Sequence, residues 1–429
     1  MFLCFARDVA IMNIIANFKK LLRWGPRGLW LYMQERFRTR SLRRQLRRSL
    51  DREVTPIRGL TVVGKLTIKG SNSKTLRDLI MALAQAGIPY QTFDMSGEDG
   101  IELPEFKKYL TPTNEFVLNR YDHLVEFAPS VVGRINGVAK ARIVFWEFES
   151  GLLYGYPDVP NEECIIAMSD FNFEYFRRTL PRTHVLKLLY PFQCDNRTSA
   201  QEFRDVRQKY GLRMDDFLVY FNFDFGSGYS RKNPEGALRA FAAAFADVPS
   251  AKLLLKTSGA NAYPEKVEKL KALASELGVG ERLVFENSFL TQQEVYGLVG
   301  AADVYLSLHR GEGFGITLVE AMAMGKPVVC TNWSSTTEFC KPSCSVPIAY
   351  KLVAPQSDQI DHPYYKEVCK WADPDVNEAA AALVRLYREP QLREEIGRYA
   401  AKSVREQFST ANFRTSTEAF FDNWAGGSE

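Results

Sequence analysis

The sequence lacks any run of 18 apolar residues, so no segment reaches the length of a transmembrane helix. Its seven cysteines are scattered, without a CxxC pair or a Cys/His cluster spaced for zinc. We therefore expect reduced thiols, as in the cytosol, and no zinc site. The sequence also contains no internal repeat and no low-complexity segment, which favours ordinary globular domains.

A secretory leader is also missing from the first residues, MFLCFARDVAIMNII. Their apolar stretch follows no basic segment and is interrupted by Arg7 and Asp8. We therefore expect no signal peptide and a cytoplasmic location. Met1 and Met12 are both compatible with the start of the chain, and the sequence does not decide between them.

The positive charge is concentrated at one end of the chain. The 429 residues carry a net charge of +4, which by itself is unremarkable. Residues 1–58 contain fourteen Lys/Arg and four Asp/Glu, a net of +10, so the remainder carries +4 minus +10, or −6. The chain length predicts two or three domains, and the charge sets residues 1–58 apart as a basic N-terminal arm.

Residues 12–52 of this arm mix arginines with Trp24, Trp30 and Phe37, and Gly25-Pro26 divides them into two helical pieces. Basic amphipathic helices of this kind favour an anionic membrane surface, here the inner face of a membrane. A solvated arm and a helix packed on the protein body are the alternatives. Nucleic-acid binding is not expected, because the basic stretch is a single terminal arm without a recognition motif.

The rest of the chain alternates apolar strand patterns with helical patterns, which is typical of doubly wound parallel sheets. Residues 59–210 are predicted to form a first Rossmann-like α/β domain and residues 211–405 a second one. Residues 376–408 have helical spacing, and residues 406–429 are expected to form a C-terminal helix or tail. The predicted fold class is therefore α/β, with two doubly wound domains.

The stretch EGFGITLVE, from Glu312 to Glu320, is the most informative motif. VYLSL predicts a buried strand before it, HRGEGFG a glycine-rich turn, and ITLVEAMAMG a helix that ends at Gly325. Gly313 and Gly315 allow backbone N–H groups to approach an anion at the helix N-terminus. Two carboxylates beside a phosphate-binding turn fit a ligand with hydroxyls and phosphates, such as a nucleotide sugar.

The second half of the sequence, which contains this motif, resembles the retaining, nucleotide-sugar-dependent glycosyltransferases of the GT4 type. These enzymes have the two-domain GT-B fold. The resemblance is strongest to bacterial enzymes of cell-surface polysaccharide assembly, which are often mannosyltransferases. It spans about 160 residues. The matching segments are DFGSGYSRKNPEGALRAFAAAF, LLLKTSG, SLHRGEGFGITLVEAMAMGKPVVCTNWSSTTEF and WADPDVNEAA. The first domain matches more weakly, through GKLTIKGSNSKTLRDLIMALAQAGI and WEFE.

The resemblance assigns roles to the residues of the motif. Glu320 is implied to hydrogen-bond the donor ribose, and Glu312 to face the donor sugar near the reacting carbon. The implied diphosphate contacts are Gly313, Phe314, Gly315, Ile316 and Thr317. His309 is expected to support the site rather than to react.

Basic residues from two other strand ends are implied to neutralise the leaving diphosphate. Arg231 and Lys232 lie in the loop GSGYSRKNP, and Lys256 lies near the end of the next strand. Many family members carry an arginine six residues before the loop lysine, whereas this sequence has Gly226 there. Whether Arg231 or Lys232 reaches the diphosphate is therefore open. In the first domain, Ser71 is implied to lie near the donor phosphate or acceptor.

The expected activity is transfer of a hexose to a polysaccharide or lipid-linked glycan, with mannose from GDP-mannose as the best single choice and a UDP-sugar as the other option. No DxD motif is placed to hold a divalent metal, so a metal-independent enzyme is expected. The alternatives are a degenerate, non-catalytic assembly or glycan-binding subunit and another GT-B enzyme, such as a nucleotide-sugar epimerase. Base, sugar, acceptor, linkage and oligomeric state are not encoded in these patterns.

Overall fold

The computed structural model describes residues 40–42, 44–51, 53–127, 138–149, 164–193, 199–356, 359 and 370–425. Most of the basic arm, and with it most of the predicted membrane contact, lies outside these residues. The described chain forms two compact units. The first comprises the described parts of 40–73, 89–126 and 138–140, and the second comprises 74–88, 127 and the described residues from 141 onward. The domain boundaries expected from the sequence stay a prediction.

The first sheet has six strands in the order β2-β1-β3-β4-β5-β6, and the pairs β1–β2, β1–β3, β4–β5 and β5–β6 are parallel. Its strands are β1 (Ile57–Gly64), β2 (Tyr90–Asp94), β3 (Tyr121–Phe127), β4 (Ala139–Ile143), β5 (Cys164–Ala167) and β6 (Val185–Lys187). The helices in this part of the chain are α2 (Ser71–Ala86), α3 (Pro104–Lys107) and α4 (Asp170–Thr179). The α/β architecture with a parallel sheet that the sequence predicted here is confirmed.

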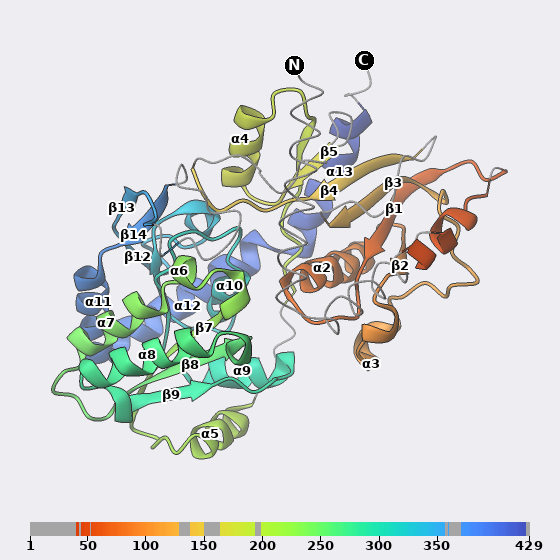
Figure 1. The fold of residues 1–429 in the computed structure, drawn as a ribbon. Helices are drawn as coiled ribbons and strands as arrows, with labels where there is room; N and C mark the ends of the chain where they lie inside the picture. The colour runs from red at the N-terminus through yellow and green to blue at the C-terminus, as the bar shows by residue number, and fades with distance from the viewer. Residues whose placement is uncertain are drawn as a thin grey trace. The chain divides into compact units, whose positions relative to one another are not determined.

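The second sheet has the order β12-β11-β10-β7-β8-β9, with parallel pairing throughout (Figure 1). Its strands are β7 (Phe217–Asp224), β8 (Ala251–Ser258), β9 (Leu283–Glu286), β10 (Val304–Ser307), β11 (Val328–Thr331) and β12 (Val346–Ile348). The helices α5 (Ala200–Lys209), α6 (Tyr229–Lys232), α7 (Pro234–Ala244), α8 (Pro264–Glu276), α9 (Gln292–Ala301) and α10 (Ile316–Ala323) alternate with these strands. This arrangement confirms the doubly wound parallel sheet.

The C-terminal part adds a two-stranded sheet and three helices. Strands β13 (Tyr350–Val353) and β14 (Trp371–Pro374) pair antiparallel. The stretch 376–408 forms two helices, α11 (Val376–Arg388) and α12 (Pro390–Gln407), and α13 (Thr410–Ala425) follows. The division falls at Pro390, which begins α12 because proline lacks the N–H that a continuous helix would need there.

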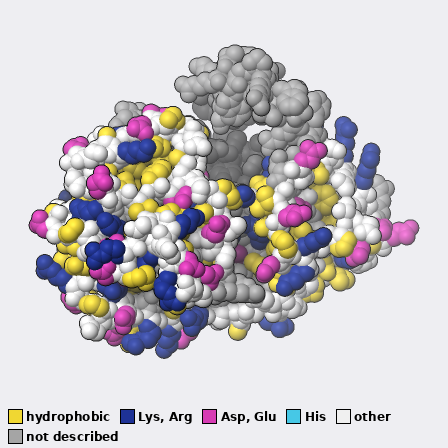
Figure 2. Space-filling view, turned by 90° about the horizontal axis from the view of Figure 1, so that it is seen from below, with side chains coloured by type: hydrophobic (Ala, Val, Ile, Leu, Met, Phe, Trp, Pro, Cys, Tyr) yellow, Lys and Arg dark blue, Asp and Glu magenta, His cyan; other side chains and the backbone are white. Residues whose placement is uncertain are grey.

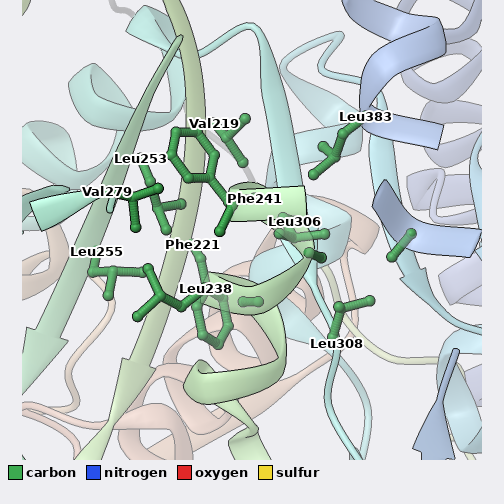
Figure 3. Packing of buried hydrophobic residues seen from close by; sticks show 14 of the residues in the cluster. Val219, Phe221, Leu238, Phe241, Leu253, Leu255, Val279, Leu306, Leu308 and Leu383 are labelled. Atoms are coloured by element: carbon green, nitrogen blue, oxygen red, sulfur yellow. The ribbon is translucent and has the colours of Figure 1, made fainter. Parts of the chain in front are cut away.

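The core of the second sheet consists of side chains from β7, β8 and β10 packed with α7. Alternate residues of β7, Val219 and Phe221, belong to one cluster with Leu253 of β8 and Phe241 of α7 (Figure 3). The intervening residues of β7 are buried as well, as expected for a parallel strand covered on both faces. This packing fixes the carboxyl ends of β7 and β10, which carry the two loops of the site.

The surface shown in Figure 2 carries Lys/Arg and Asp/Glu side chains interspersed rather than in a region of one sign. In the part of the chain that the structure describes, no helix is both long and apolar enough to cross a bilayer.

Candidate active site

The loop between β10 and α10 has the strand, turn and helix geometry expected from the sequence. Gly315 is the N-cap of α10 and has a φ of 96°, which L side chains rarely adopt. A Cβ at Gly315 would lie 2.8 Å from the side chain of Thr336, and one at Gly313 would lie 2.9 Å from Phe145. Gly315 is therefore required by conformation as well as by space, and Gly313 by space. The first turn of α10 leaves N–H groups without intrahelical partners, which suits an anion.

Glu312 lies in this loop and pairs with the two basic residues of the loop after β7. Lys232 Nζ donates a hydrogen bond of 2.5 Å to Glu312 Oε2, and Arg231 Nη1 lies 3.9 Å from the same oxygen. Glu147, which follows β4, adds a second carboxylate at 3.5 Å from Arg231 Nε. The structure thus brings Glu312, Arg231 and Lys232 together, and their catalytic roles stay a prediction.

Asn233 connects the two loops. It has a φ of 54°, a left-handed value that asparagine tolerates better than most residues, and it caps α7 by accepting a hydrogen bond from Gly236 N. Its Nδ2 donates to Leu308 O at 2.9 Å, at the end of β10. Asn233 therefore fixes where the basic pair lies relative to Glu312. No role was predicted for Asn233 from the sequence, although it lies in the loop GSGYSRKNP.

Arg231 and Lys232 differ in what their side chains already bind. Arg231 Nη1 donates to Gly311 O at 2.7 Å and Nη2 donates to Ser227 O at 2.6 Å. Arg231 is buried. Because its two hydrogen bonds go to carbonyls of different loops, its guanidinium joins the two loops. The Lys232 ammonium makes its hydrogen bond to a carboxylate instead, a partner that an incoming anion can replace.

The pKa values of this cluster follow from burial and charge pairing. Burial alone would raise the pKa of Glu312, but Lys232 and Arg231 outweigh it and hold that pKa at about 2. Burial lowers the pKa of Lys232, with Glu312 opposing the change, and burial raises the pKa of Glu147. The cluster thus contains two basic side chains and two carboxyl groups, so that neither type of charge is in excess. A bound diphosphate would bring additional negative charge, which favours release of Lys232 from Glu312.

His309 lies beneath the loop. It is completely buried, its Nδ1 lies 3.2 Å from Ser307 Oγ, and its Nε2 has no hydrogen-bond partner within the described residues. Burial lowers the pKa of His309 to about 4. The ring is therefore neutral near pH 7, which suits a supporting role.

We expect His309 to reduce stability in acid. The unfolded chain, where the histidine pKa is near 6.5, binds this proton as the pH falls, whereas the folded protein does not until about pH 4. The free energy of unfolding should therefore fall between those pH values. Urea unfolding at pH 7 and pH 4.5 measures the fall, which should be smaller in His309→Leu. His184→Leu, at an exposed histidine, is the control, and an equal fall in all three proteins would contradict the assignment.

Glu320 is buried within α10, apart from this cluster. Its Oε1 accepts hydrogen bonds from Tyr296 Oη at 3.2 Å and Gln292 Nε2 at 3.1 Å, both on α9. Lys74 Nζ lies 3.5 Å from the same oxygen, and burial raises the pKa of Glu320. These three partners were not predicted from the sequence, because no motif marks residues that meet only through folding. Thr317, one turn earlier, accepts a hydrogen bond from Tyr305.

Two other predicted site residues lie elsewhere. Lys256 Nζ donates to the backbone carbonyls of Thr257 at 2.6 Å and Ser288 at 3.0 Å, and no described contact joins it to Glu312. Ser71 begins α2 and belongs to the first compact unit. Their roles stay predictions. Within the described ranges, no group of three or more His, Cys, Asp or Glu side chains is arranged to hold a metal ion.

Comparison with known proteins identifies the family. Residues 202–403 match the family described as "Glycosyl transferases group 1". Mannosylfructose-phosphate synthase of Agrobacterium fabrum is 27% identical over 158 residues, which cover 35% of this chain and 33% of that protein. The match therefore spans about a third of the length of that curated relative.

Two solved structures share the fold over nearly their whole length. Sucrose-phosphate synthase from Thermosynechococcus elongatus has a TM-score of 0.60 at 17% identity and covers 87% of this chain and 100% of that chain. Anabaena HepE, solved with UDP and glucose, has a TM-score of 0.57 at 14% identity. This match covers 85% of the present chain and 100% of the HepE chain. Residues 202–403 therefore belong to the group 1 glycosyltransferases of the GT4 type, and the chain has the GT-B fold.

Proposed function

We propose that this chain is a retaining glycosyltransferase that moves a hexose from a nucleotide sugar to a polysaccharide or lipid-linked glycan. The main support is the cluster of Lys232, Arg231 and Glu312 at the N-terminus of α10. Lys232 is a cation near the first turn of α10, and Glu312 is a partner that it can exchange for another anion. Such a cation and helix N-terminus can together stabilise the negative charge of a leaving diphosphate. The buried Glu320 on the same helix suits a hydroxyl-bearing partner.

In this proposal the residues act as follows. The N–H groups from Gly313 to Thr317 bind the diphosphate, and Lys232 leaves Glu312 to neutralise charge that develops on it. Glu312, whose pKa Lys232 and Arg231 hold at about 2 before the donor binds, then faces the donor sugar. Arg231 keeps the two loops in place through its carbonyl contacts. Glu320 accepts a ribose hydroxyl. Retention and attack on the leaving-group face are inferred from the family resemblance.

The preferred donor is GDP-mannose. The Agrobacterium relative is named a mannosylfructose-phosphate synthase, which supports mannose, whereas Anabaena HepE was solved with UDP, so a UDP-hexose is the alternative. We also propose metal independence, since Lys232, Arg231 and the helix N-terminus supply positive charge without a cation. The basic arm over residues 12–52 would bring the enzyme to the cytoplasmic face of an anionic membrane. A non-catalytic assembly or glycan-binding subunit is the competing function.

We expect one nucleoside diphosphate to stabilise the protein against heat. Melting temperatures should be compared with UDP, GDP, ADP and CMP, each with and without EDTA. A ligand at a hundred times its Kd adds about 2.7 kcal/mol to the free energy of unfolding, which a melting curve resolves easily. A shift with GDP that survives EDTA supports a metal-independent GDP-sugar enzyme.

The other outcomes discriminate between the proposals. A shift with UDP keeps the transferase and replaces the donor with a UDP-hexose. A shift that EDTA abolishes contradicts metal independence. Absence of a shift with every nucleotide favours the non-catalytic subunit.

A further inference from the structure

Helix α2 presents a buried polar stripe formed by Lys74, Thr75 and Asp78, and these three residues belong to the same compact unit as α10. The spacing places these residues on one side of the helix. Thr75 is fully buried, Asp78 is 2% exposed, and the side chain of Lys74 is 14% exposed. Charged groups are costly to bury without partners, so the partners of this stripe indicate what it does.

Lys74 joins the stripe to α10. Its Nζ lies 2.7 Å and 3.0 Å from the two carboxylate oxygens of Asp78 and 3.5 Å from Glu320 Oε1. The Lys74 ammonium therefore pairs with two carboxylates, those of Asp78 and Glu320. Burial raises the pKa of Asp78 to about 6, although Lys74 opposes the change. Asp78 holds Lys74 with two hydrogen bonds, and Lys74 in turn approaches Glu320.

All described contacts to the Glu320 carboxylate converge on one of its two oxygens. Tyr296, Gln292 and Lys74 each approach Oε1. None of these contacts involves Oε2. A carboxylate offers about four acceptor positions over its two oxygens. The three partners therefore fix the rotation of the carboxylate and leave Oε2 to accept a hydrogen bond from a ligand.

The same stripe also supports the glycine-rich loop. Tyr190 Oη lies 3.3 Å from Thr75 Oγ1 and 3.4 Å from Asp78 Oδ2. The Tyr190 ring stacks on Phe314, with a centroid distance of 4.0 Å and an interplanar angle of 16°. Phe314 lies between the two glycines of the loop. One face of α2 thus contacts the loop through Tyr190 and α10 through Lys74.

We propose that the Lys74–Asp78 pair is a positioning element for nucleotide recognition, which holds Glu320 Oε1 so that Oε2 receives a ribose hydroxyl. This inference rests on the proposed function, because it takes Glu320 as the ribose-binding carboxylate. A purely structural role for the pair is less well supported by its chemistry. Buried ion pairs often cost more in desolvation than they return in stability, and here a third charged group shares the ammonium.

The test compares two probes that differ only in the ribose hydroxyls. Affinities of wild type and Lys74→Met are measured by calorimetry with GDP, UDP and the 2′,3′-dideoxy form of each. For the nucleotide that wild type binds, the variant should lose about tenfold in affinity, as for a lost hydrogen bond to a charged group. Its affinity for the dideoxy form should change less than about twofold, since Glu320 has no ribose hydroxyl to bind there.

Two further variants keep the test decisive. Lys74→Arg retains the charge and should recover most of the affinity, and the doubly neutral Lys74→Met/Asp78→Asn removes the stranded carboxylate in case the single variant folds poorly. An equal loss for both probes, or no loss for either, would overturn the positioning role. A wild type that binds none of the nucleotides would instead overturn the proposed function.

Discussion

The Lys232→Met variant is expected to lose about 10²–10³-fold in the rate of nucleoside diphosphate release from the donor, as when one preorganised charge-stabilising donor is removed. Lys232 is the cation whose only described hydrogen bond goes to Glu312, so it can move to the diphosphate when the donor binds. The loss should appear in kcat more than in KM, because the charge on the leaving group grows in the transition state.

Three comparisons make this prediction specific. Lys232→Arg keeps the charge and should retain more activity than Lys232→Met. Lys402→Met removes an exposed lysine of α12 and should behave as wild type. Melting curves show whether each variant is folded. A folded Lys232→Met protein with more than about a tenth of the wild-type rate would contradict the assigned electrostatic role.

The Glu320→Gln variant is expected to weaken nucleoside diphosphate binding by about tenfold to a hundredfold, the effect of losing a hydrogen bond to a charged acceptor. Glutamine keeps the size of the side chain but removes the charge that accepts the ribose hydroxyl. Calorimetric titration with the nucleotide selected by the melting experiment measures the loss.

The matched control is Glu395→Gln, at an exposed glutamate of α12. It should leave the affinity unchanged. A folded Glu320→Gln protein that binds the nucleotide as tightly as wild type would make Glu320 an ordinary buried helix residue. The second carboxylate of the motif would then need a different explanation.

Much of the second sheet could be predicted because its signals are local. The apolar run before Ser307 predicted β10, and the helical spacing after Gly315 predicted α10. Each inference needs only neighbours in the chain. Pro390 shows the limit of periodicity, since α11 and α12 have continuous helical spacing on both sides of a break.

The candidate site could be predicted only where one motif carried it. Glu312 and Lys232 were each recognised in a loop, and the parallel sheet brings both loops to the carboxyl ends of β7 and β10. By contrast, Lys74 and Asp78 lie in a segment that matched the family only weakly and gave them no role, and Tyr190 lies outside the matching segments. Their roles depend on side-chain contacts across the fold, which patterns along one sequence do not specify.

The central claim, sugar transfer from a nucleotide sugar, is tested most directly by NMR of the wild-type protein with GDP-mannose and a panel of UDP-hexoses in EDTA. Slow donor hydrolysis needs no knowledge of the natural acceptor. We expect release of nucleoside diphosphate from one donor, with the free sugar first appearing in the anomeric configuration of that donor. Intact donors throughout, or first release of the opposite anomer, would contradict this expectation.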